Sequence, residues 1–247
     1  MINDNDVLLL ALSALPQNNG TFEVYIDSTG KKTLTPQTRN YTAKDNEPVC
    51  NEQSKEGLLY GKNPKKIIFP NCSETLGYNY YGAFESAFSG CTSLTSISFP
   101  SLTSASGGNY YGAFKFVFEN CTSLTSVSFP SLTSASGGNY YGAFESAFSG
   151  CTSLTSISFP SLTSASGGGN RGAFIEAFNN CTSLTSISFP SLTSASGGHV
   201  LATFYGAFKG CSPSLKVHFK KSMKGTARLD YKTMKLTSAD QVVFDLP

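Results

Sequence analysis

The sequence predicts an α/β repeat protein, a solenoid of stacked 30-residue units that each contribute one short helix and one short parallel strand. Residues 79–108 and 139–168 are identical, and near-copies begin at positions 109 and 169. Leu, then Ile or Val, then Phe-Pro follow each of the first four cysteines of the series at fixed spacing. The cysteines that mark the period are Cys91, Cys121, Cys151, Cys181 and Cys211.

The segment LTSISFP at 94–100 predicts the strand. Apolar Ile97 and Phe99 alternate with serines, which is the two-residue period of a strand with one buried face. Pro100 ends the strand, because proline cannot donate a hydrogen bond to a neighbour. Strands that recur in one register every 30 residues must pair as a parallel sheet, with the serine face directed outward.

The segment GAFESAF at 82–88 predicts the helix. Phe84 and Phe88 are four residues apart, as are two alanines, and such pairs share one face of a helix. A residue that tolerates the left-handed conformation, as at the end of a helix, follows two positions later. Those residues are Gly90, Asn120, Gly150, Asn180 and Gly210.

The repeat divides the chain into three parts. Residues 51–219 form the solenoid, residues 1–50 an N-terminal cap or attachment segment, and residues 220–247 a C-terminal cap that covers the open end. TFEVYID at 21–27 alternates like a strand and precedes a turn. An amphipathic helix is expected before Pro16, because proline disfavours its continuation.

The composition argues against several classes of protein. A net charge of +2 lacks the strongly basic face of a nucleic-acid binder. No apolar run reaches the roughly 18 residues that would cross a bilayer, so membrane insertion is not expected. Asp4 and Asp6 stand where a signal peptide carries positive charge. Either the mature protein starts at this point, or it is not exported by that route.

The chemistry-bearing residues indicate no enzyme, metal site or cofactor. The chain has two histidines, no Gly-x-Ser-x-Gly motif, no repeated pair of acids and no Cys-x-x-Cys pair. The repeat cysteines should point inward as a ladder of packed free thiols. Their spacing of about 4.8 Å also permits disulfide bridges. Cys50 and Cys72 lie outside this series and could pair with each other.

The helical insert varies between repeats while the remainder stays constant. The inserts read NYYGAFESAF, NYYGAFKFVF, GNRGAFIEAF and HVLATFYGAF. A constant core with one variable edge favours a recognition surface, and Tyr gives contact area at low entropic cost. Alternatively, the tyrosines pack against the next repeat and fill the insert. The candidate binding residues are Tyr80, Tyr81, Tyr110, Tyr111, Tyr140, Tyr141 and Arg171.

The motif Cys-x-x-Leu-x-x-Ile-x-Phe-Pro, preceded by Ala-Phe-x-Gly, resembles the BspA-like leucine-rich repeat. Matching stretches include AFSGCTSLTSISFPSLTS at 87–104 and AFNNCTSLTSISFPSLTS at 177–194, and the resemblance covers about 56–219. It implies a right-handed leucine-rich-repeat solenoid, typical of surface and secreted proteins that host-associated microbes use for adhesion.

Two functions follow from these observations. The first is a non-catalytic recognition or adhesion scaffold that binds a protein or glycan, at a cell surface or after secretion. The alternative is a structural component of a virion such as a phage particle, with residues 1–50 as the attachment element and the solenoid projecting. The sequence does not name a ligand or an oligomeric state.

Overall fold

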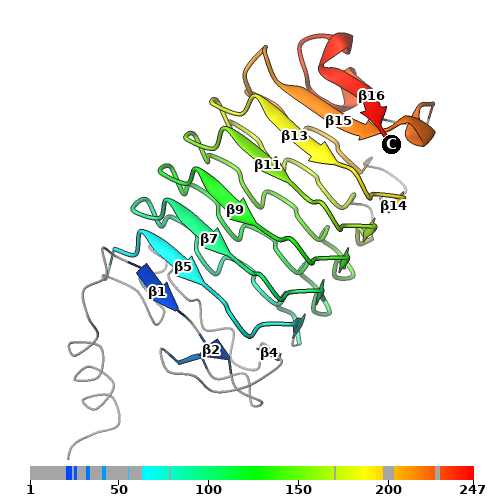
Figure 1. The fold of residues 1–247 in the computed structure, drawn as a ribbon. Coiled ribbons are helices and arrows are strands. Elements are labelled where there is room, and N and C mark those ends of the chain that lie inside the picture. Colours follow the sequence, from blue (N-terminus) through cyan, green and yellow to red (C-terminus); the bar gives the residue numbers. More distant parts are fainter. Residues whose placement is uncertain are drawn as a thin grey trace, which may run out of the picture.

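The computed structural model describes most of the chain from residue 63 onward and, before it, Lys55 and four short strands. The continuous ranges are 63–77, 79–169, 171–196, 203–225 and 229–247. The helix expected before Pro16 and any pairing of Cys50 lie outside the described residues. Within them, the chain winds as a parallel β-solenoid whose strands lie side by side along one face (Figure 1).

The strands predicted from LTSISFP are confirmed. They are β5 (Lys66–Ile68), β7 (Ser96–Ser98), β9 (Ser126–Ser128), β11 (Ser156–Ser158), β13 (Ser186–Phe189) and β15 (Lys216–Lys220). Paired strands align equivalent positions, so Ile67 lies opposite Ile97 and Ile157 opposite Ile187. As predicted, Ile97 is buried between two partly exposed serines. At the two ends of this row, β1 (Thr21–Glu23) pairs with β5, and β16 (Val242–Leu246) pairs with β15.

The serine-rich return of each repeat adds a second strand, which the sequence analysis did not anticipate. Together with the N-terminal segment, these short strands make a six-stranded parallel sheet. They are β4 (Tyr41–Thr42), β6 (Glu74–Leu76), β8 (Ser104–Ala105), β10 (Ser134–Ala135), β12 (Ser164–Ala165) and β14 (Ser194–Ala195). A separate antiparallel pair joins β2 (Tyr25–Ile26) and β3 (Lys32–Thr33).

The predicted helix in each repeat is wrong, because GAFESAF folds as consecutive turns. Alternate amides bond in two directions: Phe84 N–H donates to Ala113 O of the next repeat at 2.7 Å, whereas Ala87 N–H donates back to Phe84 O at 3.2 Å. Ser86 lies at φ 52° within the segment, which no right-handed helix allows. We call each such segment a tandem turn. The described helices lie in the C-terminal cap: α2 (Tyr231–Met234) and the short 3₁₀ turns η1 (Lys221–Met223) and η2 (Ala239–Gln241).

The left-handed residues at the end of each tandem turn are confirmed. Gly90 and Gly150 have φ 75°, and Asn120 has φ 59°. The alternation of Gly and Asn has a steric reason, since a Cβ on Gly150 would collide with the Asn120 side-chain oxygen. Each described asparagine of this series therefore fills space that the glycine of the following repeat leaves open.

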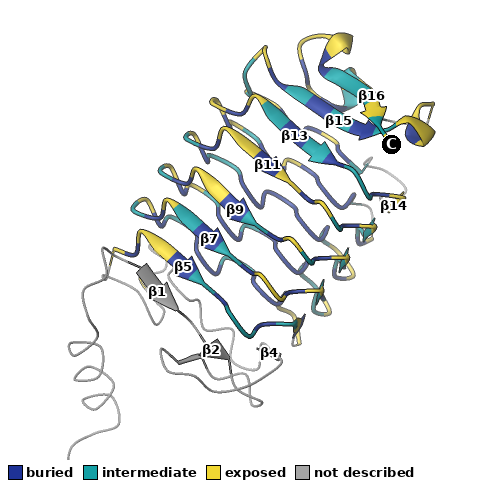
Figure 2. Ribbon diagram, in the orientation of Figure 1, coloured by how far each residue is buried: buried dark blue, intermediate teal, exposed yellow. Residues whose placement is uncertain are grey.

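The interior consists of phenylalanine columns and a cysteine column. Buried residues recur at equivalent places in successive turns (Figure 2). Phe144 stacks between Phe114 and Phe174 with ring centroids 5.0 and 4.9 Å away. The predicted ladder of packed free thiols is confirmed for the described cysteines, and Cys72 is also free and buried. Four of these thiols, at 121, 151, 181 and 211, donate to a phenylalanine carbonyl of the preceding repeat, as Cys151 Sγ does to Phe118 O at 3.1 Å.

Small hydroxyls join the repeats at the surface. Thr103 Oγ1 donates to Ser73 O at 2.9 Å, and Thr133 repeats this bond to Thr103 O at 2.9 Å. Ser131 Oγ donates to the carbonyl of Pro100 at 2.9 Å. These bonds satisfy carbonyl oxygens between repeats. Much of the Ser and Thr content therefore serves stacking.

The strand row divides between the second and third complete repeats. One sheet runs β1-β5-β7-β9 and another β11-β13-β15-β16, while the second row of strands continues unbroken across the same junction. The rings of Phe129 and Phe159 are 6.1 Å apart across this division, compared with 5.0 Å between Phe99 and Phe129. The stack is therefore slightly open on its strand face at one position.

Candidate functional site

The candidate site is the edge formed by three Asn-Tyr-Tyr segments, which precede the tandem turns at 79–81, 109–111 and 139–141. The main-chain hydrogen bonds that join successive repeats continue through this edge. Tyr110 N–H donates to Tyr80 O at 3.2 Å, and Tyr140 N–H donates to Tyr110 O at 3.3 Å. The main chain of these segments therefore repeats at about one strand spacing, near 4.8 Å. We call the six tyrosine side chains, at 80, 81, 110, 111, 140 and 141, the tyrosine edge.

The tyrosines form two rows along the solenoid axis. In the outer row, the ring centroids of Tyr80, Tyr110 and Tyr140 are separated by 6.3 and 4.4 Å. In the inner row, the rings of Tyr81, Tyr111 and Tyr141 are separated by 6.1 and 5.1 Å. The rings thus contact neighbouring repeats, as the packing alternative expects.

The same tyrosines also present a large accessible surface. Tyr80 is 65% exposed, Tyr140 57% and Tyr81 41%. Asn79, Asn109 and Asn139 beside them are exposed as well. A side chain that only filled the insert would be covered, so packing does not account for the whole edge. The binding role assigned to these tyrosines stays a prediction.

A row of charged side chains lies beneath the rings. At equivalent positions of successive repeats stand Glu85, Lys115 and Glu145, and Arg171, at the position of the inner tyrosines in the next repeat, joins the row through its ion pair with Glu145. Lys115 is buried, and its ammonium lies 4.6 Å from the Tyr111 ring centroid and 4.3 Å from that of Tyr141. A cation so close to aromatic faces attracts them electrostatically. The ammonium therefore helps to fix the orientation of the inner tyrosines.

Arg171 contacts both this charged row and the tyrosine edge. Its guanidinium forms an ion pair with the buried carboxylate of Glu145 and lies 4.9 Å from the Tyr141 ring centroid. The structure therefore does bring Arg171 to the predicted tyrosines. Its side chain is 41% exposed, so it can still reach a ligand at that end of the edge.

The buried charges have shifted protonation equilibria. Burial raises the pKa of Glu85 to about 7, against the opposing effects of the Lys115 charge and a hydrogen bond from the Gly82 backbone. Burial also raises the pKa of Glu145, which Arg171 opposes, and lowers the pKa of Lys115, which Glu85 and Glu145 oppose. One buried carboxylate oxygen of Glu85, Oε2, has no hydrogen-bond partner. Glu85 is thus the least compensated charge of the row.

This charged row was not predicted from the sequence. Its signal was present, because Glu, Lys and Glu stand at positions 85, 115 and 145 of otherwise similar repeats. On the helix that was expected, these residues would have faced solvent. On the tandem turn they lie beneath the tyrosines, so the error about local structure concealed their role.

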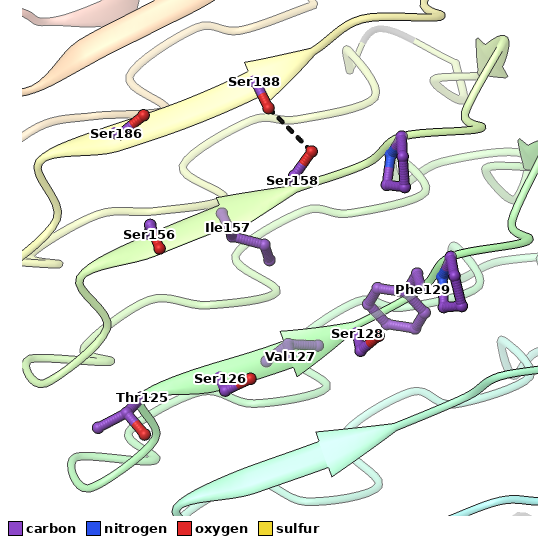
Figure 3. Close-up of a pocket in the computed structure, with 12 residues that line it drawn as sticks. Thr125, Ser126, Val127, Ser128, Phe129, Ser156, Ile157, Ser158, Ser186 and Ser188 are labelled. Carbon is purple, nitrogen blue, oxygen red and sulfur yellow. Dashed lines mark hydrogen bonds between the residues drawn. The ribbon is translucent and has the colours of Figure 1, made fainter.

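The serine-lined strand face offers a different surface. A shallow hollow of about 500 Å³ lies across β9, β11 and β13, at the division of the strand row. Figure 3 shows Ser126, Ser156 and Ser186 on three neighbouring strands, with Ser188 donating to Ser158 at 2.8 Å. No charged or aromatic side chain other than Phe129, itself 1% exposed, lines this hollow. It can form hydrogen bonds but offers little apolar surface to bury.

The described residues hold no group of three or more His, Cys, Asp or Glu side chains that could bind a metal ion. Burial raises the pKa of the Cys151 thiol to about 12, so this column is chemically quiet. Within the same part of the chain, no helix combines the length and apolar character needed to cross a bilayer.

A family model for the BspA type leucine-rich repeat region matches the chain in 6 copies over residues 55–168 and 115–240. The chain therefore belongs to the BspA-type leucine-rich repeat family. No curated protein matches it significantly. A leucine-rich repeat protein from Bacteroides ovatus, solved by crystallography, is 27% identical with a TM-score of 0.41. The match covers 74% of this chain and 43% of that one, so the chain spans less than half of that protein.

Proposed function

We propose that the protein is a non-catalytic recognition scaffold that binds a protein or glycan through the tyrosine edge, at a cell surface or after secretion. The observation that carries this proposal is the exposed tyrosine row on a hydrogen-bonded main-chain ladder. Large aromatic side chains contribute most to binding energy at interfaces. Membership of the BspA-type repeat family is consistent with a binding scaffold.

The rigidity of the edge supports the same proposal. Ring contacts between repeats and the ammonium of Lys115 hold the inner tyrosines before any ligand arrives. A side chain that is already ordered loses less entropy on binding. The strand face lacks comparable anchors, because its outward positions are mostly serines.

Two matched variants test the site. One replaces Tyr81, Tyr111 and Tyr141 with Ser, and the other replaces Ser98, Ser128 and Ser158 with Lys. Binding of labelled protein to intact cells and to immobilised extracellular matrix proteins is compared after circular dichroism has shown that both variants are folded. We expect the tyrosine variant to lose binding by at least tenfold and the lysine variant to retain it. Loss in the lysine variant alone would move the site to the strand face.

A further inference from the structure

We propose that the tyrosine edge binds a linear, uncharged polysaccharide along the solenoid axis. This inference rests on the proposed function and names the class of ligand for that site. Three features of the described residues lead to it: the period of the edge, its local charge and the chemistry of its exposed groups.

The period of the edge is the first feature. The same unit, Asn-Tyr-Tyr-Gly, occurs at 79–82, 109–112 and 139–142, and ladder bonds fix its spacing. A ligand that makes the same contact with every unit must itself repeat at about one strand spacing, near 4.8 Å. An extended peptide advances about 3.3 Å per residue and falls out of step. A chain of sugar rings, one ring for each repeat, matches the period, whereas a globular protein surface has no such repeat.

The local charge is the second feature. Two acidic side chains, Glu85 and Glu145, and two basic ones, Lys115 and Arg171, lie together beneath the rings, so neither sign predominates there. Lys115 is buried, and Arg171 is engaged by Glu145. An anionic glycan or an acidic peptide would meet no free cation along the three units, since binding of polyanions depends on accessible Lys and Arg. The edge therefore favours an uncharged ligand.

The exposed groups are the third feature. Each unit presents an asparagine amide beside tyrosines that combine an apolar ring with a hydroxyl. A sugar ring offers the complementary pair, with apolar C–H groups on its faces and hydroxyls at its rim. In the next repeat Gly169 and Arg171 replace the first asparagine and the second tyrosine. The row of like units therefore ends there, and the site accommodates about three sugars.

The test measures binding of neutral linear oligosaccharides of two to six sugars by calorimetry. The probes are β-1,4-glucan, β-1,3-glucan, xylan and mannan fragments, with hyaluronan and alginate fragments as anionic comparisons. We expect binding to at least one neutral series, with an affinity that rises up to three or four sugars and then levels off. Absence of binding to every neutral series, or binding to the anionic fragments alone, would overturn the proposal.

Variants separate this proposal from the broader one. Tyr110→Ala removes the central ring, which contacts Tyr140 at 4.4 Å and Tyr141 at 5.5 Å, and should weaken polysaccharide binding at least tenfold. Tyr205→Ala is the matched control, because Tyr205 is 39% exposed but lies outside the Asn-Tyr-Tyr units, and it should leave binding unchanged. If Tyr110→Ala instead abolishes binding to a protein while no polysaccharide binds, the tyrosine edge stands and the ligand class is wrong. Polysaccharide binding that survives Tyr110→Ala would reject the edge as the polysaccharide site.

Discussion

On the strand side of each repeat, small hydroxyls join neighbouring turns, whereas on the tandem-turn side aromatic rings and buried charges lie between them. Thr133 Oγ1 donates to Thr103 O at 2.9 Å on the first side. On the second, Lys115 lies beneath Tyr111 and Tyr141. Both sides belong to the same 30 residues and repeat with the same spacing. They differ in what remains for a partner, because many hydroxyls are already occupied by stacking while several tyrosine rings remain exposed.

The two sides are therefore expected to respond differently to substitution. Replacing one hydroxyl of the strand side affects a single bond between repeats, worth about 1 kcal/mol. Replacing a charge of the tandem-turn side leaves its partners buried and uncompensated, which costs more.

The largest effect is expected in the shared phenylalanine columns. Phe144 is fully buried and stacked between two rings, so Phe144→Ala should lower the free energy of unfolding by about 3–5 kcal/mol. Ser156→Ala, at an exposed position of β11, should change it by no more than about 0.5 kcal/mol. Urea denaturation of both variants measures the difference. Equal shifts would mean that the inward and outward faces have been assigned incorrectly.

The thiol column provides the second test. Burial raises the pKa of the Cys151 thiol to about 12, so little thiolate forms at pH 8 and its reaction with a thiol reagent should be about a thousandfold slower than in the unfolded chain. All 7 cysteines should react after unfolding under reducing conditions. Kinetics with a chromogenic disulfide reagent measure both states. A peptide joining Cys91 to Cys121 in the unreduced protein would contradict the free-thiol ladder.

The strand side was predictable from the sequence because its residue pattern is compatible with only one local structure, a parallel strand. Alternation around Ile97, a following proline and a constant period together require a parallel ladder. The family resemblance carried by the same residues agrees with the family match. The short second strands were not predicted, because two residues such as Ser104 and Ala105 carry too little alternation to be recognised.

The tandem-turn side was not predictable in the same way, because its period of four residues is shared by a helix. Phe84 and Phe88 lie on one side in either structure. The distinguishing feature is a left-handed residue in the middle of the segment, and its identity varies: Ser86, Phe116 and Glu176 all have positive φ. Only Gly206 in the last repeat is the residue type that signals this conformation. The charged row was missed for the same reason.

The charged row predicts a pH dependence of stability. Burial raises the pKa of Glu85 from 4.5 to about 7, so between these values the folded protein holds a proton that the unfolded chain has released. The stabilising effect is complete below pH 4.5 and is lost as the pH rises through 7. The loss should be on the order of 3 kcal/mol.

Denaturation at several pH values between 4 and 8 measures this dependence in the parent protein and in Glu85→Gln. The glutamine variant should show a smaller slope than the parent protein, because its amide does not titrate. Glu176→Gln is the control, since Glu176 is exposed, and it should keep the parent slope. Burial also raises the pKa of Glu145 and of Glu119 and lowers the pKa of Lys115, so these groups contribute to the slope that remains in Glu85→Gln. Parallel slopes in the parent protein and Glu85→Gln would show that Glu85 is ionised throughout.

The smallest predicted change in stability has opposite signs for a tandem turn and for a helix, so it distinguishes the two structures. Glu176 is exposed at φ 52°, and the equivalent residue of the next repeat is Gly206 at φ 65°. A residue with a side chain is destabilised by about 1–2 kcal/mol in the left-handed conformation, and glycine avoids this strain. The greater conformational freedom of glycine in the unfolded chain offsets about half of the stability gained in this way. Glu176→Gly should therefore stabilise the protein by about 0.5–1 kcal/mol in the tandem turn. In a helix the same change would destabilise it by about 1 kcal/mol.

Glu176→Ala completes this test. Alanine keeps a Cβ and therefore keeps the strain of the left-handed conformation, so the tandem turn ranks Gly above Ala in stability. A helix ranks Ala above Gly, because alanine has the highest helix propensity. Side-chain removal is nearly the same in the two variants, so their difference isolates the backbone. Urea denaturation of the pair, read as the difference in unfolding free energy, decides between the two structures, and an alanine variant more stable than the glycine variant would restore the helix.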